Sequence, residues 1–276
     1  MTGVAAARPQ PDPITSTPMQ RAEGHTSGVT TLPDKPAPLA QWLLGELRTR
    51  ANPDNVAGMA RFGISSENTL GVTVADVRAL AREAKRSLGR DKAAHLELAK
   101  LLWASGVHEA CIMAAVLTPP KLMTRELAES WVLDLDSWDT CDQLCGNVLW
   151  ATEFAWELPA AWAARPETFV KRAGFVVITQ LAGKDKAVPD ESFAPMLLLV
   201  AEHCTDERND VKKGVNWALR AVGKRSRECH AMAVECGERI LAEHPGSRSA
   251  RWIARDALRE LRSVPVRKRL GLAQEP

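Results

Sequence analysis

The chain has 276 residues, of which 45% are hydrophobic, and its 36 Lys and Arg against 34 Asp and Glu give a formal net charge of +2. A chain of this size can bury a core large enough to fold without metal ions or disulfide bonds. Its apolar runs are too short to cross a bilayer and its first ten residues lack a signal-peptide core, so we expect a cytoplasmic protein with no membrane partner.

The charge is divided unevenly along the chain. Residues 205–276 hold 16 Lys and Arg against 10 Asp and Glu, whereas residues 1–204 hold 20 against 24. A basic C-terminal third fits a polyanionic partner such as nucleic acid, although a helix face that is merely solvated has the same composition. The charge balance alone therefore favours nucleic acid only weakly.

The first predicted element along the chain is a tail. Residues 1–36 are rich in Pro, Gly, Ser and Thr and nearly free of aromatic residues, which predicts disorder because little apolar surface is available to bury. After the tail, apolar residues recur with the period of an α-helix in successive segments. These segments are residues 39–50, 74–88, 92–104, 108–117, 124–133, 138–151, 155–164, 166–182, 191–204, 210–224, 227–243 and 247–262.

Proline residues fall at or near the starts and ends of these segments, and alternating strand patterns are nearly absent. Short loops between helices predict an all-α superhelical solenoid of antiparallel helix pairs, with one concave surface lined by successive helices. A globular helical bundle is the alternative architecture. We expect the repeat domain at residues 37–265, followed by a short basic C-terminal tail at residues 266–276.

The six cysteines are spread through helical sequence without the regular spacing of a disulfide-rich secreted domain. Buried free thiols are expected, since Cys is among the residue types most often buried. The alternative is a soft-metal site at the Cys141/Cys145 pair or at two dipeptides of His and Cys. No CxxC or HExxH pattern accompanies them, so we expect neither a metal nor any other cofactor.

Three helical segments carry aromatic and charged side chains that a solvated helix would not need. The segments are Ser137-Trp138-Asp139-Thr140-Cys141-Asp142, Lys171-Arg172-Ala173-Gly174-Phe175 and Lys212-Lys213-Gly214-Val215-Asn216-Trp217-Ala218-Leu219-Arg220. Trp138 and Asp142 are four residues apart and share a helix face. Arg172 follows Trp138 by 34 residues and Trp217 follows Arg172 by 45, roughly the period of helix-pair repeats. One surface of a solenoid can therefore present all four side chains.

At these residues the chain resembles the bacterial DNA alkylation repair proteins, which are HEAT-like-repeat alkylpurine DNA glycosylases. The resemblance rests mainly on the ordered set of Trp138 with Asp142, then Arg172, then Trp217. It spans most of the chain, because earlier segments match as well. These are Met59-Ala60-Arg61-Phe62-Gly63-Ile64, Gly71-Val72, Val77-Arg78-Ala79-Leu80, Leu102-Trp103 and His108-Glu109.

The resemblance implies a HEAT-like solenoid whose concave surface binds double-stranded DNA containing alkylated purines. Proteins of this family hydrolyse the N-glycosidic bond of purines alkylated at N3 or N7, without flipping the base out of the stack. On this expectation Asp142 is the catalytic carboxylate, which stabilises the cationic sugar and positions the attacking water. Trp138 and Trp217 are expected to flank that sugar, and the protein is expected to be a monomer.

The same resemblance assigns Arg172 to the DNA backbone, where its guanidinium can donate two hydrogen bonds to phosphate oxygens. Lys171, Lys212, Lys213 and Arg220 lie beside the motif positions in sequence, and we expect them to contact phosphates as well. Further basic residues on later turns can follow the duplex, and seven tryptophans are expected to be structural. The basic residues are Lys224, Arg225, Arg248, Arg251 and Arg255, and the tryptophans are Trp42, Trp103, Trp131, Trp150, Trp156, Trp162 and Trp252.

The sequence departs from the family pattern before Trp138, where Ser137 stands in place of an aromatic residue. The chain has no Tyr, so Phe62 is the candidate substitute for a family tyrosine near the N-terminal helices. Two other functions stay open: a non-catalytic helical-repeat protein that binds damaged or branched DNA, and a protein-interaction scaffold. Retention of Asp142 with both tryptophans favours the glycosylase, because a pure DNA binder gains nothing from a carboxylate that repels phosphate.

Overall fold

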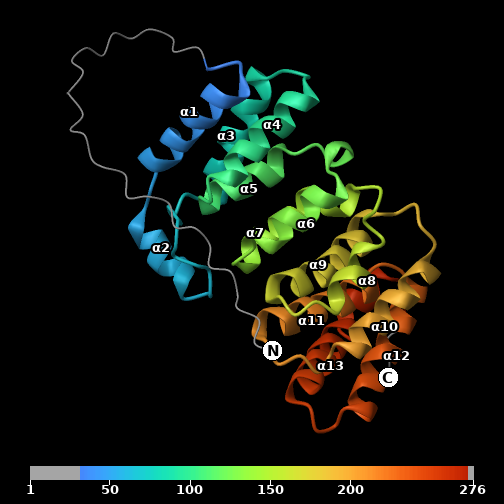
Figure 1. Cartoon of the computed structure of the whole chain (residues 1–276). Helices are drawn as coiled ribbons and strands as arrows, with labels where there is room; N and C mark the ends of the chain where they lie inside the picture. Colours follow the sequence, from blue (N-terminus) through green and yellow to red (C-terminus); the bar gives the residue numbers. More distant parts are fainter. Residues whose placement is uncertain (1–31, 273–276) are drawn as a thin grey trace, which may run out of the picture. The chain divides into compact units, whose positions relative to one another are not determined.

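Figure 1 shows the fold in a computed structural model, which describes residues 32–272. Within those residues every regular element is a helix, and they form a single compact unit. The α-helices are α1 (Pro36–Thr49), α2 (Pro53–Ala60), α3 (Val74–Ser87), α4 (Lys92–Ala104), α5 (His108–Leu117), α6 (Arg125–Leu133), α7 (Trp138–Asn147), α8 (Leu158–Ala163), α9 (Thr168–Lys184), α10 (Ala194–Glu202), α11 (Asn209–Gly223), α12 (Arg227–Glu243), α13 (Arg248–Leu261) and α14 (Val264–Arg269). The 3-10 helices are η1 (Pro120–Leu122), η2 (Leu149–Ala151) and η3 (Asp190–Phe193).

The helices pack in two layers. In the first, α3, α5, α7, α9, α11 and α13 contact one another in that order, and we call this the odd-numbered layer. In the second, α8 packs on α10 and α10 on α12. Helices of the two layers pair as α4 with α5, α8 with α9 and α12 with α13. This is the arrangement of a solenoid of helix pairs, so the all-α solenoid prediction is confirmed.

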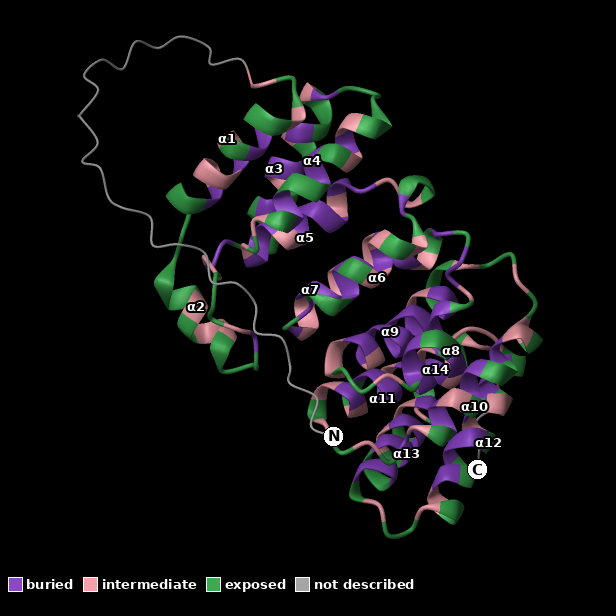
Figure 2. Ribbon diagram, in the orientation of Figure 1, coloured by how far each residue is buried: buried purple, intermediate pink, exposed green. Residues whose placement is uncertain are grey.

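The apolar core lies between the layers, and α9 is the helix it covers most completely. Figure 2 shows buried positions on the helix faces that meet other helices, and along most of α9. Burying one Leu, Val or Phe side chain contributes about 1.5–3 kcal/mol. Gly174 lets α8 approach closely, because a β-carbon at this position would lie only 3.3 Å from Trp162 Cβ. The polar residues that α9 does carry, such as Arg172, are therefore held in a rigid surrounding.

Several helix starts are specified by a side chain that accepts a hydrogen bond from the first turn. Such caps contribute about 0.5–2 kcal/mol each, because they satisfy amide groups that have no partner within the helix. The capping residues are Asn52 for α2, Thr73 for α3, Asp91 for α4, Thr124 for α6, Ser226 for α12 and Ser247 for α13.

The observed helix bounds agree with most predicted segments to within a few residues, with local exceptions. The segment 138–151 is divided, because the helical backbone ends at Val148 (φ −125°, ψ −65°) and the 3-10 turn η2 follows. The short helices α2 and α14 were not predicted. No residue of α2 is buried, so the sequence held no apolar period to mark it.

Residues 1–31 of the predicted tail lie outside the described residues, and Pro36, its last residue, is the first residue of α1. The predicted boundary at residue 265 falls inside α14. No helix in the part of the chain that the structure describes is long and apolar enough to cross a bilayer.

Candidate active site and nucleic-acid interface

Hydrogen bonds to the segment that precedes α3 fix the start of α7. Trp138 Nε1 donates to the Phe62 carbonyl oxygen at 3.0 Å, so the plane of this half-buried ring is set. Ser137, which is fully buried, accepts a hydrogen bond from the Ser65 amide at 3.0 Å. Its hydroxyl in turn donates to an Asp136 carboxylate oxygen at 3.0 Å. Ser137 therefore holds the start of α7 in place at the position where the sequence departs from the family pattern.

One turn after Trp138, Asp142 pairs with Arg172 of α9. Arg172 donates to Asp142 Oδ1 from Nε (3.1 Å) and from Nη2 (3.0 Å), and Nη2 also donates to Oδ2 at 3.0 Å. The Arg172 side chain is 6% exposed and the Asp142 side chain 18%. Burial raises the pKa of the Asp142 carboxyl above its usual value, although the Arg172 guanidinium acts in the opposite direction. The site holds a carboxyl group that is largely shielded from water and has a cationic partner.

Arg172 also links α7 to α11. Its Nη1 donates to the Asp210 carbonyl oxygen in the first turn of α11, at 2.8 Å. Gly214 lies one turn further, where a β-carbon would stand 3.5 Å from Arg172 Cγ. Trp217 follows on the same face of α11, seven residues after Asp210, and is half-buried against the core. Three neighbouring helices of the odd-numbered layer thus carry the four predicted motif residues.

Two of the residues expected at phosphates, Lys171 and Arg172, take part in internal pairs. Lys171 Nζ lies 3.0 Å from Asp206 Oδ2, and these two side chains are 11% and 9% exposed. Arg208 Nη2 donates to the same oxygen at 2.6 Å. Burial acts against ionisation, but these donors hold the pKa of the Asp206 carboxyl well below its usual value. Lys171 reaches a phosphate only if its pair with Asp206 rearranges, whereas Arg172 keeps one N–H of Nη1 that is not used by Asp142 or Asp210.

The other three expected phosphate ligands lie on α11 and differ from one another. Arg220 pairs with Glu260 of α13. Lys212 Nζ lies 5.2 Å from the centroid of the Trp252 ring, which is also on α13. Lys213 is exposed and forms no hydrogen bond or ion pair through its side chain within residues 32–272. Lys212 and Lys213 are therefore the most available of the five predicted basic residues.

Comparison with known proteins assigns the chain to a sequence family. Residues 43–261 match the sequence profile described as DNA alkylation repair enzyme. The chain belongs to this family. Nothing among the curated proteins matches the chain significantly.

A solved structure supports the same fold for this family member. It was reported as "A new family of proteins related to the HEAT-like repeat DNA glycosylases with affinity for branched DNA structures", and it aligns with a TM-score of 0.66. The alignment covers 86% of this chain and 98% of that one at 20% sequence identity, which shows a shared HEAT-like fold.

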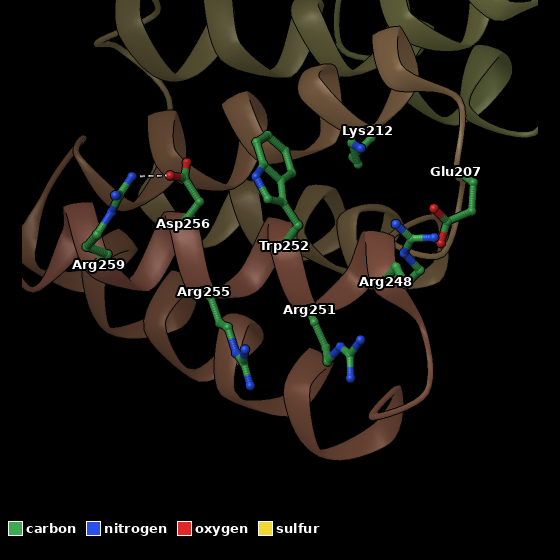
Figure 3. A pocket seen from close by; sticks show the side chains of 8 residues that line it. All are labelled: Glu207, Lys212, Arg248, Arg251, Trp252, Arg255, Asp256 and Arg259. Atoms are coloured by element: carbon green, nitrogen blue, oxygen red, sulfur yellow. Dashed lines mark hydrogen bonds and ion pairs between the residues drawn. The ribbon is translucent and has the colours of Figure 1, made fainter.

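In this family member, a groove between α11 and α13 carries an exposed tryptophan, Trp252, for which the sequence predicts a structural role (Figure 3). The groove has a volume of ≈ 710 Å³. Trp252 in its lining is 40% exposed, whereas Trp103 and Trp131 stack inside the protein with their ring centroids 4.2 Å apart. The full lining is Glu207, Lys212, Arg248, Arg251, Trp252, Arg255, Asp256 and Arg259. Nothing in the sequence around Trp252 distinguished it from the buried tryptophans.

The two family-pattern residues at the start of α5 have structural partners that sequence reasoning did not assign. His108 Nε2 lies 2.8 Å from Asp139 Oδ2 beside Trp138, in the lining of a cavity of ≈ 650 Å³. Burial lowers the pKa of His108, but the hydrogen bond and charge of Asp139, together with the charges of Glu109 and Asp136, act in the opposite direction, and the net shift is upward. The buried Glu109 carboxylate accepts hydrogen bonds from the amides of residues 70–72 and so fixes the loop that enters α3.

All six cysteines are free thiols, and five of them are buried, as expected. Burial raises the pKa of Cys111 to about 12 and the pKa values of Cys204, Cys229 and Cys236 to about 11. These four thiols are therefore protonated at neutral pH. Within residues 32–272, no group of three or more His, Cys, Asp or Glu side chains is arranged to hold a metal ion.

Proposed function

We propose that this protein is a DNA glycosylase that hydrolyses the N-glycosidic bond of purines alkylated at N3 or N7 in duplex DNA. The observation that supports this most is the Asp142–Arg172 pair, in which three hydrogen bonds hold a carboxylate that is 18% exposed and one turn from Trp138. A surface that only binds DNA gains nothing from such a group, since a carboxylate repels phosphate.

The substrate itself makes the bond labile. A purine alkylated at N3 or N7 is cationic, so it takes the electron pair of the breaking C–N bond and leaves as a neutral base without being protonated. The deoxyribose then carries an oxocarbenium-like cation. The Asp142 carboxylate stabilises this cation, and the low exposure of the site makes the attraction stronger than it would be in bulk water.

Asp142 is also proposed to align the water molecule that attacks the sugar. Its Oδ2 accepts one hydrogen bond from Arg172, which leaves acceptor capacity for a water molecule. That water forms the new bond to the sugar carbon, and its proton passes to the carboxylate or to solvent. Asp142 is therefore proposed as the catalytic residue for both cation stabilisation and water alignment.

The remaining motif residues act on the sugar and on Asp142. Trp138 and Trp217 are proposed to flank the sugar, where each aromatic face adds about 0.5–2 kcal/mol of cation–π attraction. Arg172 is proposed to orient Asp142 in the free protein. The second N–H of its Nη1 is the donor left for a phosphate, since Asp210 takes the other. This set needs no pocket for an extruded base, so the damaged base remains stacked.

For binding to duplex DNA, we propose that Lys212 and Lys213 contact phosphates directly. Lys171 and Arg220 belong to the same basic surface, and they reach phosphate when DNA competes with Asp206 and Glu260 for them. We propose that the protein acts as a monomer.

A second candidate function is binding of branched DNA without excision. The solved structure with the same fold belongs to a family with affinity for branched DNA, and this is the observation in its favour. In that case Asp142 and the tryptophans would be retained parts of the fold that perform no chemistry. The protein would then bind DNA without releasing a modified base.

The deciding experiment measures release of the modified base from a duplex that carries a single N7-methylguanine. We expect the wild-type protein to release it well above the spontaneous rate. Asp142→Asn should reduce the rate constant by about 10²–10³-fold, the usual cost of removing one group that stabilises transition-state charge. Duplex affinity should be retained, because the carboxylate does not attract DNA.

The matched control is Asp190→Asn, which removes a carboxylate from another buried arginine, Arg225, whose side chain is 5% exposed. Excision per folded molecule should be unchanged in this variant. Base release by wild type no faster than the spontaneous rate, together with DNA binding, would instead favour the branched-DNA binder.

A further inference from the structure

One face of α13 carries a row of cations around an exposed tryptophan. Residues at i, i+3, i+4, i+7 and i+11 share a helix face, and all five of these positions on α13 are exposed. They are Arg248, Arg251, Trp252, Arg255 and Arg259. Figure 3 shows the Trp252 ring directed toward Lys212 of α11, whereas the Arg251 and Arg255 side chains extend in the opposite direction. An aromatic ring is thus flanked by cations on both sides.

Three of these arginines have no partner within residues 32–272. The side chains of Arg248, Arg251 and Arg255 form no hydrogen bond or ion pair there, whereas Arg259 pairs with Asp256. Like charges on one helix face repel one another, so this arrangement does not stabilise the helix. The free guanidinium groups are therefore available for an anionic partner.

The groove beside this row of arginines is also suited to an anionic ligand that can stack on an aromatic ring. Its lining holds five cations and two carboxylates around a volume of ≈ 710 Å³. Trp252 is 40% exposed, although Trp is highly buried on average. Exposed aromatic rings beside positively charged grooves are the means by which single-stranded nucleic acid is bound, because a base stacks on the ring while cations follow the backbone.

We propose that the α13 groove binds an unpaired segment of DNA, with a base stacked on Trp252 and phosphates held by Arg248, Arg251 and Arg255. Bases inside an intact duplex are stacked on both faces and offer none to a side chain. The partner is therefore DNA with an accessible base at a branch, gap or overhang.

The dimensions of the row suit a short segment. Arg248 and Arg255 are seven residues apart, which is about 10 Å along the helix axis. The row can therefore contact only a few consecutive phosphates. The inference rests on the DNA binding in the proposed function but not on base excision.

The test compares the affinities of full-length protein for three ligands: a duplex, the same duplex with a single-stranded overhang, and a forked duplex. We expect wild type to prefer the overhang and the fork. Trp252→Ala should weaken binding to these two by at least about fivefold, the loss expected when one stacked base is released, without changing affinity for the blunt duplex. Trp252→Phe should restore most of the preference, since Phe keeps an aromatic face.

The control is Trp150→Ala. Trp150 is half-buried and, like Trp252, lies beneath a lysine, with Lys184 Nζ 5.0 Å from its ring centroid. It is outside the groove, so this variant should bind all three ligands as wild type does. Arg251→Gln and Arg255→Gln should each reduce the salt dependence of overhang binding by about one phosphate contact.

The outcomes separate this inference from the proposed function. Equal affinity of Trp252→Ala and wild type for the fork, with duplex binding intact, would overturn the groove assignment and leave the glycosylase proposal standing. Tighter binding of the same overhang made of RNA would overturn the assignment to DNA. Failure of wild type to bind any of the ligands would overturn both.

Discussion

A buried arginine is found near each end of α9, and the two arginines have different partners. Arg172, close to the start of α9, pairs with Asp142 of the neighbouring helix and is 6% exposed. Arg225, which follows α11, pairs with Asp190 at 2.8 Å and is 5% exposed. Arg225 also donates to carbonyl oxygens around the end of α9. These belong to Ala182, Asp185 and Val188.

The pKa values of the two carboxyl partners, Asp190 and Asp142, are shifted in opposite directions. Hydrogen bonds from Ser226 and Arg225 lower the pKa of Asp190, so the folded protein favours its ionised form. Burial raises the pKa of Asp142, so the folded protein disfavours the ionised form of this carboxyl group. A carboxylate that the fold disfavours, placed beside aromatic side chains, is typical of a functional site. We therefore expect the Arg225 pair to stabilise the fold, and we propose that the Arg172 pair presents a reactive group.

Arg225→Met should have the largest effect on stability. It removes the Arg225 donor from Asp190 and from three carbonyl oxygens, and removal of one partner of a buried pair costs about 3–5 kcal/mol. Urea unfolding followed by circular dichroism should show a lower midpoint. Excision per folded molecule should stay the same. A loss below about 1 kcal/mol would mean that the pair acts like a surface salt bridge and that the comparison fails.

Arg172→Lys should act on excision more than on stability. Lysine keeps the positive charge, but its single nitrogen cannot occupy the three separate positions from which Arg172 donates to Asp142 and Asp210. A small displacement of a catalytic group lowers the rate constant by about 10²-fold, and we expect a loss of that order. Single-turnover release of N7-methylguanine measures it.

Arg225→Lys is the matched control for this prediction. It should lower the free energy of unfolding and leave single-turnover excision unchanged. Equal excision losses in the two lysine variants would show that the effect follows from general destabilisation and not from the orientation of Asp142.

Two glycines of α11 extend the comparison to backbone packing. At Gly223, close to Arg225, a β-carbon would lie 2.7 Å from Leu261 Cδ2 and 2.9 Å from Ala233 Cβ. Gly223→Ala should therefore cost about 1–3 kcal/mol through overpacking. At Gly214, beside Arg172, the nearest atom would be 3.5 Å away, an ordinary contact. Gly214→Ala should raise stability by up to about 1 kcal/mol through helix propensity.

Thermal unfolding of both alanine variants measures this difference directly. Similar stability changes of the same sign in the two variants would mean that α11 shifts to relieve the contact at Gly223. The close packing around Arg225 would then be less rigid than the structure indicates.

Most of the fold could be predicted from the sequence because its helices bury an apolar face and so show a regular period. That period is absent from α2, none of whose residues is buried, and α14 is only six residues long. The bounds of α8 could not be predicted well either. A segment starting at residue 155 looked helical, but the helix begins at Leu158, just before Pro159.

The candidate site could be predicted in part, because the motif order selected Asp142, Arg172 and both tryptophans, which lie on the three neighbouring helices α7, α9 and α11. The direction in which a long basic side chain extends is set by residues far away in sequence. Asp142 lies 30 residues before Arg172, and Asp190 lies 35 residues before Arg225. For the same reason Trp252 could not be separated from the buried tryptophans, since its exposure depends on how α11 and α13 pack.

The smallest predicted effect concerns the two carboxyl groups themselves. Carboxyl carbon NMR should place the titration midpoint of Asp142 above the ordinary value of 3.8 and that of Asp190 below it. Because the folded pKa of Asp190 is depressed, its contribution to stability is present above pH 3.8 and is lost as the pH falls through the folded pKa. The raised pKa of Asp142 has the opposite consequence. Its ionisation costs stability above the folded pKa, and this cost disappears as the pH falls toward 3.8.

The two asparagine variants should therefore differ in the sign of their pH dependence. As the pH is lowered toward 3.8, the free energy of unfolding of wild type should rise relative to that of Asp142→Asn. As the pH is lowered below 3.8, the free energy of unfolding of wild type should fall relative to that of Asp190→Asn. Urea unfolding across the acid range measures both differences. The same sign for both would mean that Arg172 compensates fully for the burial of Asp142, and that the two ends of α9 hold their carboxylates in the same way.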